Sequence, residues 1–241
     1  MRILQVTNFF KPMWESGGVA RVAYDISKHL SVKGHDVTVY TTNRSINPQN
    51  VKTNKLSLVD GMKVYYFENL RRFFPWTTIP VIPYYLPFII RKQIRNFDII
   101  HIHEHRSLLS AIVYLYAKKY GIPYVLQSHG SVLPFFAKQK SKKFFDKLIG
   151  FRILKHASKL IALNQTEAEQ YITMGVEKDK IEIVPNGIDL EEYRKLPERG
   201  FFRKKYGIGE DEKIILYLGR IHETKGIDLL IKSVAEIKKK M

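Results

Sequence analysis

The sequence predicts an α/β protein whose first domain is a Rossmann-like, doubly wound parallel sheet, followed by an incomplete second Rossmann-like domain. Three observations support this prediction. Short apolar runs of strand length alternate with stretches whose apolar residues recur at helical spacing. Glycine or proline follows several of these stretches, which is typical of helix ends. With 45% hydrophobic residues among 241, the chain can bury a large core, and alternating strands and helices favour a parallel sheet covered on both faces.

The first predicted strand is the apolar run at residues 3–6, and a helix follows it. Gly34 is the expected C-terminal cap of this helix. One helix face is formed by apolar residues at a spacing of three and four, namely Val19, Val22, Ala23, Ile26 and Leu30. Strands are predicted next at 36–42 and 62–68, with a polar loop at 43–55.

The same alternation continues as far as Pro185. The predicted strands lie at residues 97–103, 124–128, 159–163 and 181–184. The predicted helices lie at residues 107–120, 142–156 and 166–174. The first domain is therefore predicted to span residues 1–185.

Residues 73–90 form an 18-residue segment without a charged side chain. This length reaches the lower limit for a helix that spans a membrane. Proline removes a backbone donor at each of four positions, Pro75, Pro80, Pro83 and Pro87. Unsatisfied carbonyl groups are costly in hydrocarbon, so we predict that the segment does not span a membrane.

Residues 186–241 are predicted to form the linker and the start of a second domain. A turn signal at 186–189 precedes a short basic helix at 201–206, a strand at 214–218 and an amphipathic helix at 227–238. One strand and one helix cannot bury their apolar faces alone. We therefore expect the beginning of a second α/β domain that continues beyond this sequence.

Composition limits the classes of function. The absence of cysteine excludes a disulfide framework, a thiolate nucleophile and a cysteine-ligated metal. The net charge of +17 predicts anionic partners, which include nucleic acid, anionic lipid and phosphorylated small molecules. Met1 and Arg2 lead directly into the first strand, so we expect no signal peptide and a cytoplasmic location, with peripheral attachment to the inner face of the membrane as an alternative.

Two glycines follow the first predicted strand, where open parallel sheets bind ligands. Gly17 and Gly18 begin the first helix, and glycine lets a ligand approach the backbone closely. Free amides at a helix start attract a phosphate or carboxylate. The alternative is that the pair only shapes a turn.

Histidines lie at the ends of two further predicted strands. His101 and His103 alternate along one strand, but a strand places such side chains about 6–7 Å apart and a third ligand is lacking, so a metal site is not expected. We predict a buried His101, with His103 and Glu104 at the rim of a cleft. His129 follows the next strand, where it faces either the cleft or the core.

Arg220 and Lys225 flank the turn between the predicted strand at 214–218 and the helix after it. A planar guanidinium and a mobile ammonium group could neutralise a diphosphate beside helix amides. The alternative is an ordinary charged loop in solvent.

Together these segments resemble the large retaining glycosyltransferase group with the GT-B fold, family 4. The segments are Ser16 to Arg21, Gly34 to Val39, Pro185 to Asp189, and Gly219 to Gly226. The resemblance implies that the first domain binds the acceptor and the second a nucleotide-diphosphate sugar. It implies that Gly17 and Gly18 lie beside a donor or acceptor phosphate, that Arg220 and Lys225 hold the donor diphosphate, and that His129 lies near the transferred sugar. Asn186 belongs to the interdomain motif at the cleft rim.

The resemblance also implies a hexosyltransferase-type enzyme that needs no metal and no cofactor apart from the nucleotide sugar. The acceptor would be a glycan precursor or a lipid-linked molecule. The chain ends before the paired glutamates of this family, so we expect little or no activity from the 241 residues alone. The alternative is a non-catalytic module, derived from a transferase, that binds an acceptor or a membrane.

A basic and aromatic stretch at residues 138–159 predicts docking on an anionic membrane. Phe135 and Phe136 precede it. The alternative is an ordinary helix with Phe144, Leu148 and Phe151 on its core side. Nucleic acid is not an expected partner, because the sequence contains no recognised binding module.

Overall fold

The structure is a computed structural model that describes residues 1–43, 51–70, 81–134, 138–219 and 221–239. The chain divides into two compact units, Met1–Asp189 and Leu190–Met241. The boundary predicted at residue 185 lies inside the first unit, so the start of the predicted linker belongs structurally to the first unit. Each unit is considered by itself below.

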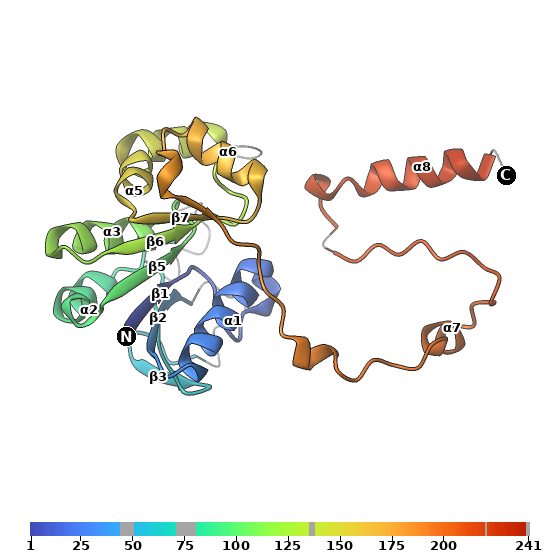
Figure 1. Ribbon diagram of the computed structural model, residues 1–241, viewed down its shortest axis with the longest axis horizontal. Coiled ribbons are helices and arrows are strands. Elements are labelled where there is room, and N and C mark those ends of the chain that lie inside the picture. Colours follow the sequence, from blue (N-terminus) through green and yellow to red (C-terminus); the bar gives the residue numbers. More distant parts are fainter. Residues whose placement is uncertain (44–50, 71–80, 135–137, 220, 240–241) are drawn as a thin grey trace. The chain divides into compact units, whose positions relative to one another are not determined.

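The first unit is built on an eight-stranded sheet with the order β3-β4-β2-β1-β5-β6-β7-β8 (Figure 1). All neighbouring strands are parallel except β3 and β4. The strands are β1 (Arg2–Val6), β2 (Asp36–Thr42), β3 (Leu56–Val59), β4 (Met62–Phe67), β5 (Ile99–His103), β6 (Tyr124–Gln127), β7 (Lys159–Ala162) and β8 (Ile181–Ile183). The predicted α/β fold class is confirmed.

Helices cover both faces of this sheet, which explains why its central strands β1, β2 and β5 are buried along almost their whole length. Helix α1 (Gly18–Val32) lies on one face, and α2 (Leu86–Gln93) and α3 (Leu108–Tyr120) lie on the other (Figure 1). Helix α6 (Gln165–Thr173) connects β7 to β8. The larger core cluster joins strand residues such as Leu4 and Ile100 to Ile90 of α2 and Val113 of α3.

Two elements of the first unit were not predicted. β3 pairs antiparallel with β4 at one edge of the sheet. α2 begins in the charge-free segment at residues 73–90, of which the structure describes 81–90, and continues three residues beyond it. Leu86 and Ile90 are fully buried in the core, so this part of the segment is apolar because it packs against the sheet. In the described part of the chain, every helix is too short or too polar to cross a bilayer.

The helix predicted at 142–156 is continuous but changes its winding. It consists of α4 (Gln139–Phe145), a π-helical turn (Asp146–Gly150) and α5 (Phe151–His156). Gly150 is needed here because a Cβ atom would lie 2.6 Å from Oδ1 of Asp146. Phe144, Leu148 and Phe151 are exposed, which corrects the alternative that placed them on the core side. The core side carries Ile153 and Leu154 instead.

The second unit contains two α-helices in its described part, α7 (Phe201–Tyr206) and α8 (Ile227–Lys239), as predicted. The strand predicted at 214–218 is absent, and these residues have no regular structure. A strand is completed by hydrogen bonds to a neighbouring strand, and no other strand occurs within the described residues of 190–239. The predicted strand therefore lacks a partner.

Candidate functional site

Loops that follow neighbouring parallel strands leave one edge of the sheet, which we call the carboxyl edge. The strands are β1, β5, β6 and β7, and the segments that follow them are 7–17, 104–107, 128–131 and 163–164. Open parallel sheets bind their ligands at this edge. The topology thus gathers Gly17, Glu104 and His129 at the edge where a ligand is expected.

Two histidines from different strands contact each other at the carboxyl edge. Nδ1 of His103, the last residue of β5, lies 2.8 Å from Nε2 of His129, which follows β6. Their rings stack with centroids 5.1 Å apart and an interplanar angle of 8°. Nε2 of His103 lies 2.9 Å from Oε1 of Gln5 on β1. Three neighbouring strands are therefore joined by one polar chain.

The burial of these histidines corrects one prediction. His103 is fully buried and does not lie at the rim, because its side chain turns into the centre of the sheet. His129 is half-buried, and it is the member of the pair that reaches the edge. His101 is buried as predicted, but its ring centroid lies only 4.1 Å from that of His103. No group of three potential metal ligands is found in the described ranges.

Burial keeps all three imidazole rings neutral. It lowers the pKa of His129 to about 4 and the pKa of His101 to about 3, and repulsion from a protonated His129 would lower the pKa of His101 in the same direction. Burial and the two neighbouring histidines hold the pKa of His103 well below its ordinary value. A neutral ring donates from one nitrogen and accepts at the other. His129 can therefore orient a hydroxyl group, but it does not supply positive charge for a diphosphate.

The backbone at the ends of β5 and β6 is strained. Glu104 has a φ of 69° and His129 a φ of 52°, and non-glycine residues in this left-handed region are concentrated at functional sites. The backbone amide of Glu104 donates to the carbonyl of Gln127 at 2.8 Å. Its carboxylate accepts a hydrogen bond from Nδ2 of Asn8 at 3.1 Å. These contacts fix the half-buried Glu104 between the loops after β1 and β6.

A buried carboxylate that the sequence analysis missed holds the loop of His129. Oε1 of Glu167 accepts a hydrogen bond from the amide of Gly130 at 2.7 Å, and Oε2 accepts one from the amide of Leu163, also at 2.7 Å. The hydroxyl of Tyr171 accepts a further bond from the amide of Ser128 at 2.9 Å. Helix α6 thus fixes the loop on which His129 lies. In the sequence Glu167 looks like an ordinary first-turn acid of that helix.

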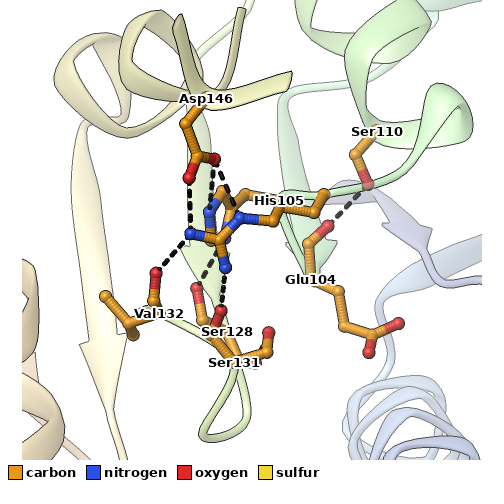
Figure 2. Close-up of polar contacts among 8 residues, drawn as sticks. Glu104, His105, Ser110, Ser128, Ser131, Val132 and Asp146 are labelled. Carbon is orange, nitrogen blue, oxygen red and sulfur yellow. Dashed lines mark hydrogen bonds and ion pairs between the residues drawn. The ribbon is translucent and has the colours of Figure 1, made fainter. Parts of the chain in front are cut away.

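A second unpredicted cluster joins three segments (Figure 2). Arg106 forms a bidentate pair with Asp146, with Nε–Oδ1 and Nη2–Oδ2 distances of 2.8 and 2.7 Å. The same guanidinium donates to the carbonyls of Ser131 and Val132. Burial raises the pKa of Asp146, but Arg106 and the nearby His105 outweigh this effect and hold it below its ordinary value. The cluster locks the loop after His129 to the helix at 139–156.

One sequence signal could have revealed this cluster. Asp146 is the only acidic residue between Lys138 and Lys159. A single acid in a strongly basic helix is a candidate for a buried partner of a specific cation.

The start of α1 differs from two other helix starts at the carboxyl edge. The side chains of Ser107 and Asn164 cap α3 and α6 by accepting hydrogen bonds from backbone amides. The N-cap residue of α1 is Gly17, which has no side chain for this purpose. Gly17 has a φ of 100°, which favours glycine, whereas Gly18 has ordinary backbone geometry and open space where a Cβ would lie. The amide of Gly17 donates to the carbonyl of Trp14, and no side chain caps the first amides of α1 itself.

The remaining predicted site residues belong to different units. Asn186 follows β8, and its Oδ1 accepts a hydrogen bond from Nε2 of Gln127 at 3.3 Å, beside the carboxyl edge. Lys225 is exposed in the second unit, at the end of a short 3-10 helix. Arg220 lies outside the described residues. The convergence of Arg220 and Lys225 on one diphosphate therefore stays a prediction.

Comparison with known proteins follows the division into two units. Residues 16–192 match the model of Glycosyltransferase Family 4, and residues 198–241 match that of Glycosyl transferases group 1. A D-inositol 3-phosphate glycosyltransferase from Kineococcus radiotolerans is 25% identical, over 92% of this chain and 52% of its own length. The GPI3 subunit of the Saccharomyces cerevisiae phosphatidylinositol N-acetylglucosaminyltransferase is 25% identical, over 98% of this chain and 49% of its own length. The chain thus spans about half the length of these relatives.

Solved structures show the same fold. Sucrose-phosphate synthase from Thermosynechococcus elongatus aligns with a TM-score of 0.66 at 18% identity, covering 98% of this chain and 60% of its own. Anabaena HepE in complex with UDP-glucose aligns with a TM-score of 0.58 at 18% identity, covering 86% of this chain and 50% of its own. The family model covers more than half of the chain, including strands β2 to β8, the histidine pair and the start of α1. The chain therefore belongs to Glycosyltransferase Family 4.

Proposed function

We propose that this chain contains the acceptor-binding domain of a glycosyltransferase that moves a hexose, with retention, from a nucleotide-diphosphate sugar to a hydroxyl group. Family membership supports sugar transfer, and the similar HepE structure contains UDP-glucose. In this proposal the nucleotide sugar is the co-substrate, and neither a metal nor another cofactor takes part. The second unit, which matches the group 1 model, contributes to the donor site.

The acceptor that fits the carboxyl edge best is a phosphorylated polyol, such as an inositol phosphate or its lipid-linked form. The observation that carries this proposal is Gly18, because neither its backbone angles nor its surroundings require a glycine. Its missing side chain leaves room for a phosphate at the uncapped amides of α1. The names of two relatives support this choice, since one acts on D-inositol 3-phosphate and the other on phosphatidylinositol.

The proposed residues have two roles in transfer, which are to neutralise the leaving group and to orient the sugar. As the bond between the sugar and the diphosphate breaks, Arg220 and Lys225 neutralise the charge that develops on the departing diphosphate. The acceptor hydroxyl attacks from the same side of the sugar, and its proton passes to the leaving oxygen. Neutral His129, held by His103, orients a hydroxyl of the sugar.

Calorimetric titration with D-inositol 3-phosphate tests the acceptor site. We expect Gly18→Ala to weaken binding about tenfold, equivalent to about 1.4 kcal/mol, because the new methyl group occupies the space of the phosphate. Val32→Ala is the control, since Val32 is exposed at the opposite end of α1. The acceptor proposal is wrong if inositol without phosphate binds equally well, or if both variants lose the same affinity.

Release of nucleoside diphosphate from a panel of nucleotide sugars tests transfer. We expect no turnover by the 241 residues and turnover by a chimaera that completes the second domain with the Kineococcus sequence. In the chimaera, Arg220→Ala should lower turnover about a hundredfold, because it removes a charge contact of the leaving group. Transfer by the 241-residue chain contradicts the first expectation. A chimaera that binds acceptor without any transfer supports the alternative of a non-catalytic module.

A further inference from the structure

The helical stretch at residues 139–156 has two apolar faces, although a surface helix needs only one. Its inner face packs into the core through buried residues that include Ile153 and Leu154. Its outer face, defined here by Phe144, Leu148 and Phe151, points away from the sheet. These three side chains are 65%, 56% and 46% exposed. They are spaced four and three residues apart and flank or lie in the π-helical turn.

The outer face is surrounded by positive charge. Its exposed cations are Lys138, Lys140, Lys143, Lys147, Arg152 and Lys155. The only acid of this stretch, Asp146, is buried against Arg106. The stretch itself therefore contributes no exposed carboxylate, and the described residues form no ion pair with these six cations. The result is an apolar strip with a purely cationic border.

We propose that the outer face docks on the surface of an anionic lipid bilayer. The aromatic and leucine side chains would enter the level of the headgroups, while the long lysine side chains reach the lipid phosphates. A second copy of the chain would bring the same six cations against one another, so self-association does not fit this surface. Nucleic acid would neutralise the cations but leave the apolar strip without a matching surface.

The internal contacts of the helix connect this surface to the carboxyl edge. Asp146 lies on the inner side of the helix and is held by Arg106, which follows β5 and also binds the carbonyls beyond His129 (Figure 2). A docked helix would thus carry the carboxyl edge at a fixed position relative to the membrane. The idea that docking brings the carboxyl edge to a lipid-linked acceptor rests on the proposed function, whereas membrane binding itself does not.

Co-sedimentation with vesicles tests the proposal in the 241-residue chain. The probes are phosphatidylcholine vesicles with and without phosphatidylglycerol, at low and high salt. We expect binding only to the anionic vesicles, weakened by salt because the cations are exposed. A variant that reverses the charge of three lysines beside the outer face carries Lys140→Glu, Lys143→Glu and Lys147→Glu. We expect it to bind anionic vesicles on the order of a hundredfold more weakly, at about fivefold for each lysine.

Matched controls separate the surface from net charge. Three exposed lysines elsewhere in the first unit provide the same change in charge, by Lys92→Glu, Lys118→Glu and Lys119→Glu. Leu148→Ser is matched by Leu115→Ser on α3, where the leucine is 53% exposed. We expect each outer-face variant to lose affinity and each control to stay within about threefold of the original chain, with unchanged thermal unfolding.

Three results would overturn the proposal. The first is no binding of the original chain to phosphatidylglycerol vesicles at low salt. The second is an equal loss in both lysine triples, which would mean that binding follows net charge alone. The third is a dimer in sedimentation equilibrium that Phe144→Ser dissociates, which would assign the outer face to a second copy. Because the readout is lipid binding, failure here leaves the transfer assays unaffected.

Discussion

Gly17 and Gly18 are neighbours in the sequence, but the fold needs only the first as a glycine. Gly17 ends the loop after β1 with a φ of 100°, a region that is costly for residues with a Cβ. Gly18 is the first residue of α1, where alanine is a better helix former than glycine. A glycine that the fold does not require is a candidate for a position shaped by a ligand.

This difference can be measured by urea unfolding of the two alanine variants. We expect Gly17→Ala to lower the free energy of unfolding by about 1–3 kcal/mol, because alanine must adopt strained backbone angles. Gly18→Ala should leave it unchanged or raise it by up to about 1 kcal/mol, since a helical glycine is replaced. If Gly18→Ala were the more destabilising change, a structural role would explain Gly18 and the argument for a phosphate would fail.

The helix at 139–156 is connected to the carboxyl edge through one buried ion pair. Arg106 reaches from the end of β5 to Asp146 in the π-helical turn, and both side chains are almost fully buried. Removing one partner of a buried pair leaves the other charge without compensation, which costs far more than losing a pair at the surface. The helix, and the outer face that it carries, therefore depend on this pair for their position.

Asp146→Asn tests this dependence. We expect it to lower the free energy of unfolding by about 3–5 kcal/mol, because it leaves the guanidinium of Arg106 buried without a counter-charge. Asp36→Asn is the control, since Asp36 pairs with Lys63 in solvent and should change stability by less than about 1 kcal/mol. Similar effects of the two substitutions in urea unfolding would show that the Arg106 pair does not hold the helix.

The stability of the whole molecule is expected to depend on the histidines whose pKa values burial lowers, among them His101, His103, His105 and His129. Their pKa values are lowered in the folded chain, to about 4 for His129 and about 3 for His101. The unfolded chain gains protons on these rings below about pH 6.5, while the folded chain does not. Stability is therefore complete above that pH and is lost as the pH falls toward the folded pKa values.

Urea unfolding between pH 7 and pH 5 measures this effect. Each histidine should contribute a slope of about 1.4 kcal/mol per pH unit in the lower part of that range. His129→Gln should remove the contribution of one ring. A profile that His129→Gln leaves unchanged would mean that His129 does not stay neutral in the folded chain.

The sequence by itself determined the α/β class and the position of most helices and strands, because apolar periodicity and helix ends are local properties of the chain. It did not determine β3, which depends on pairing with β4, or that residues 214–218 form no strand, since the described residues of their unit contain no strand to pair with. Only the tertiary structure decided that His103 is buried, that Glu167 and the Arg106–Asp146 pair hold the loop of His129, and that Phe144 faces outward. These features join residues far apart in the chain, and their partners are chosen by the three-dimensional arrangement of the strands and helices.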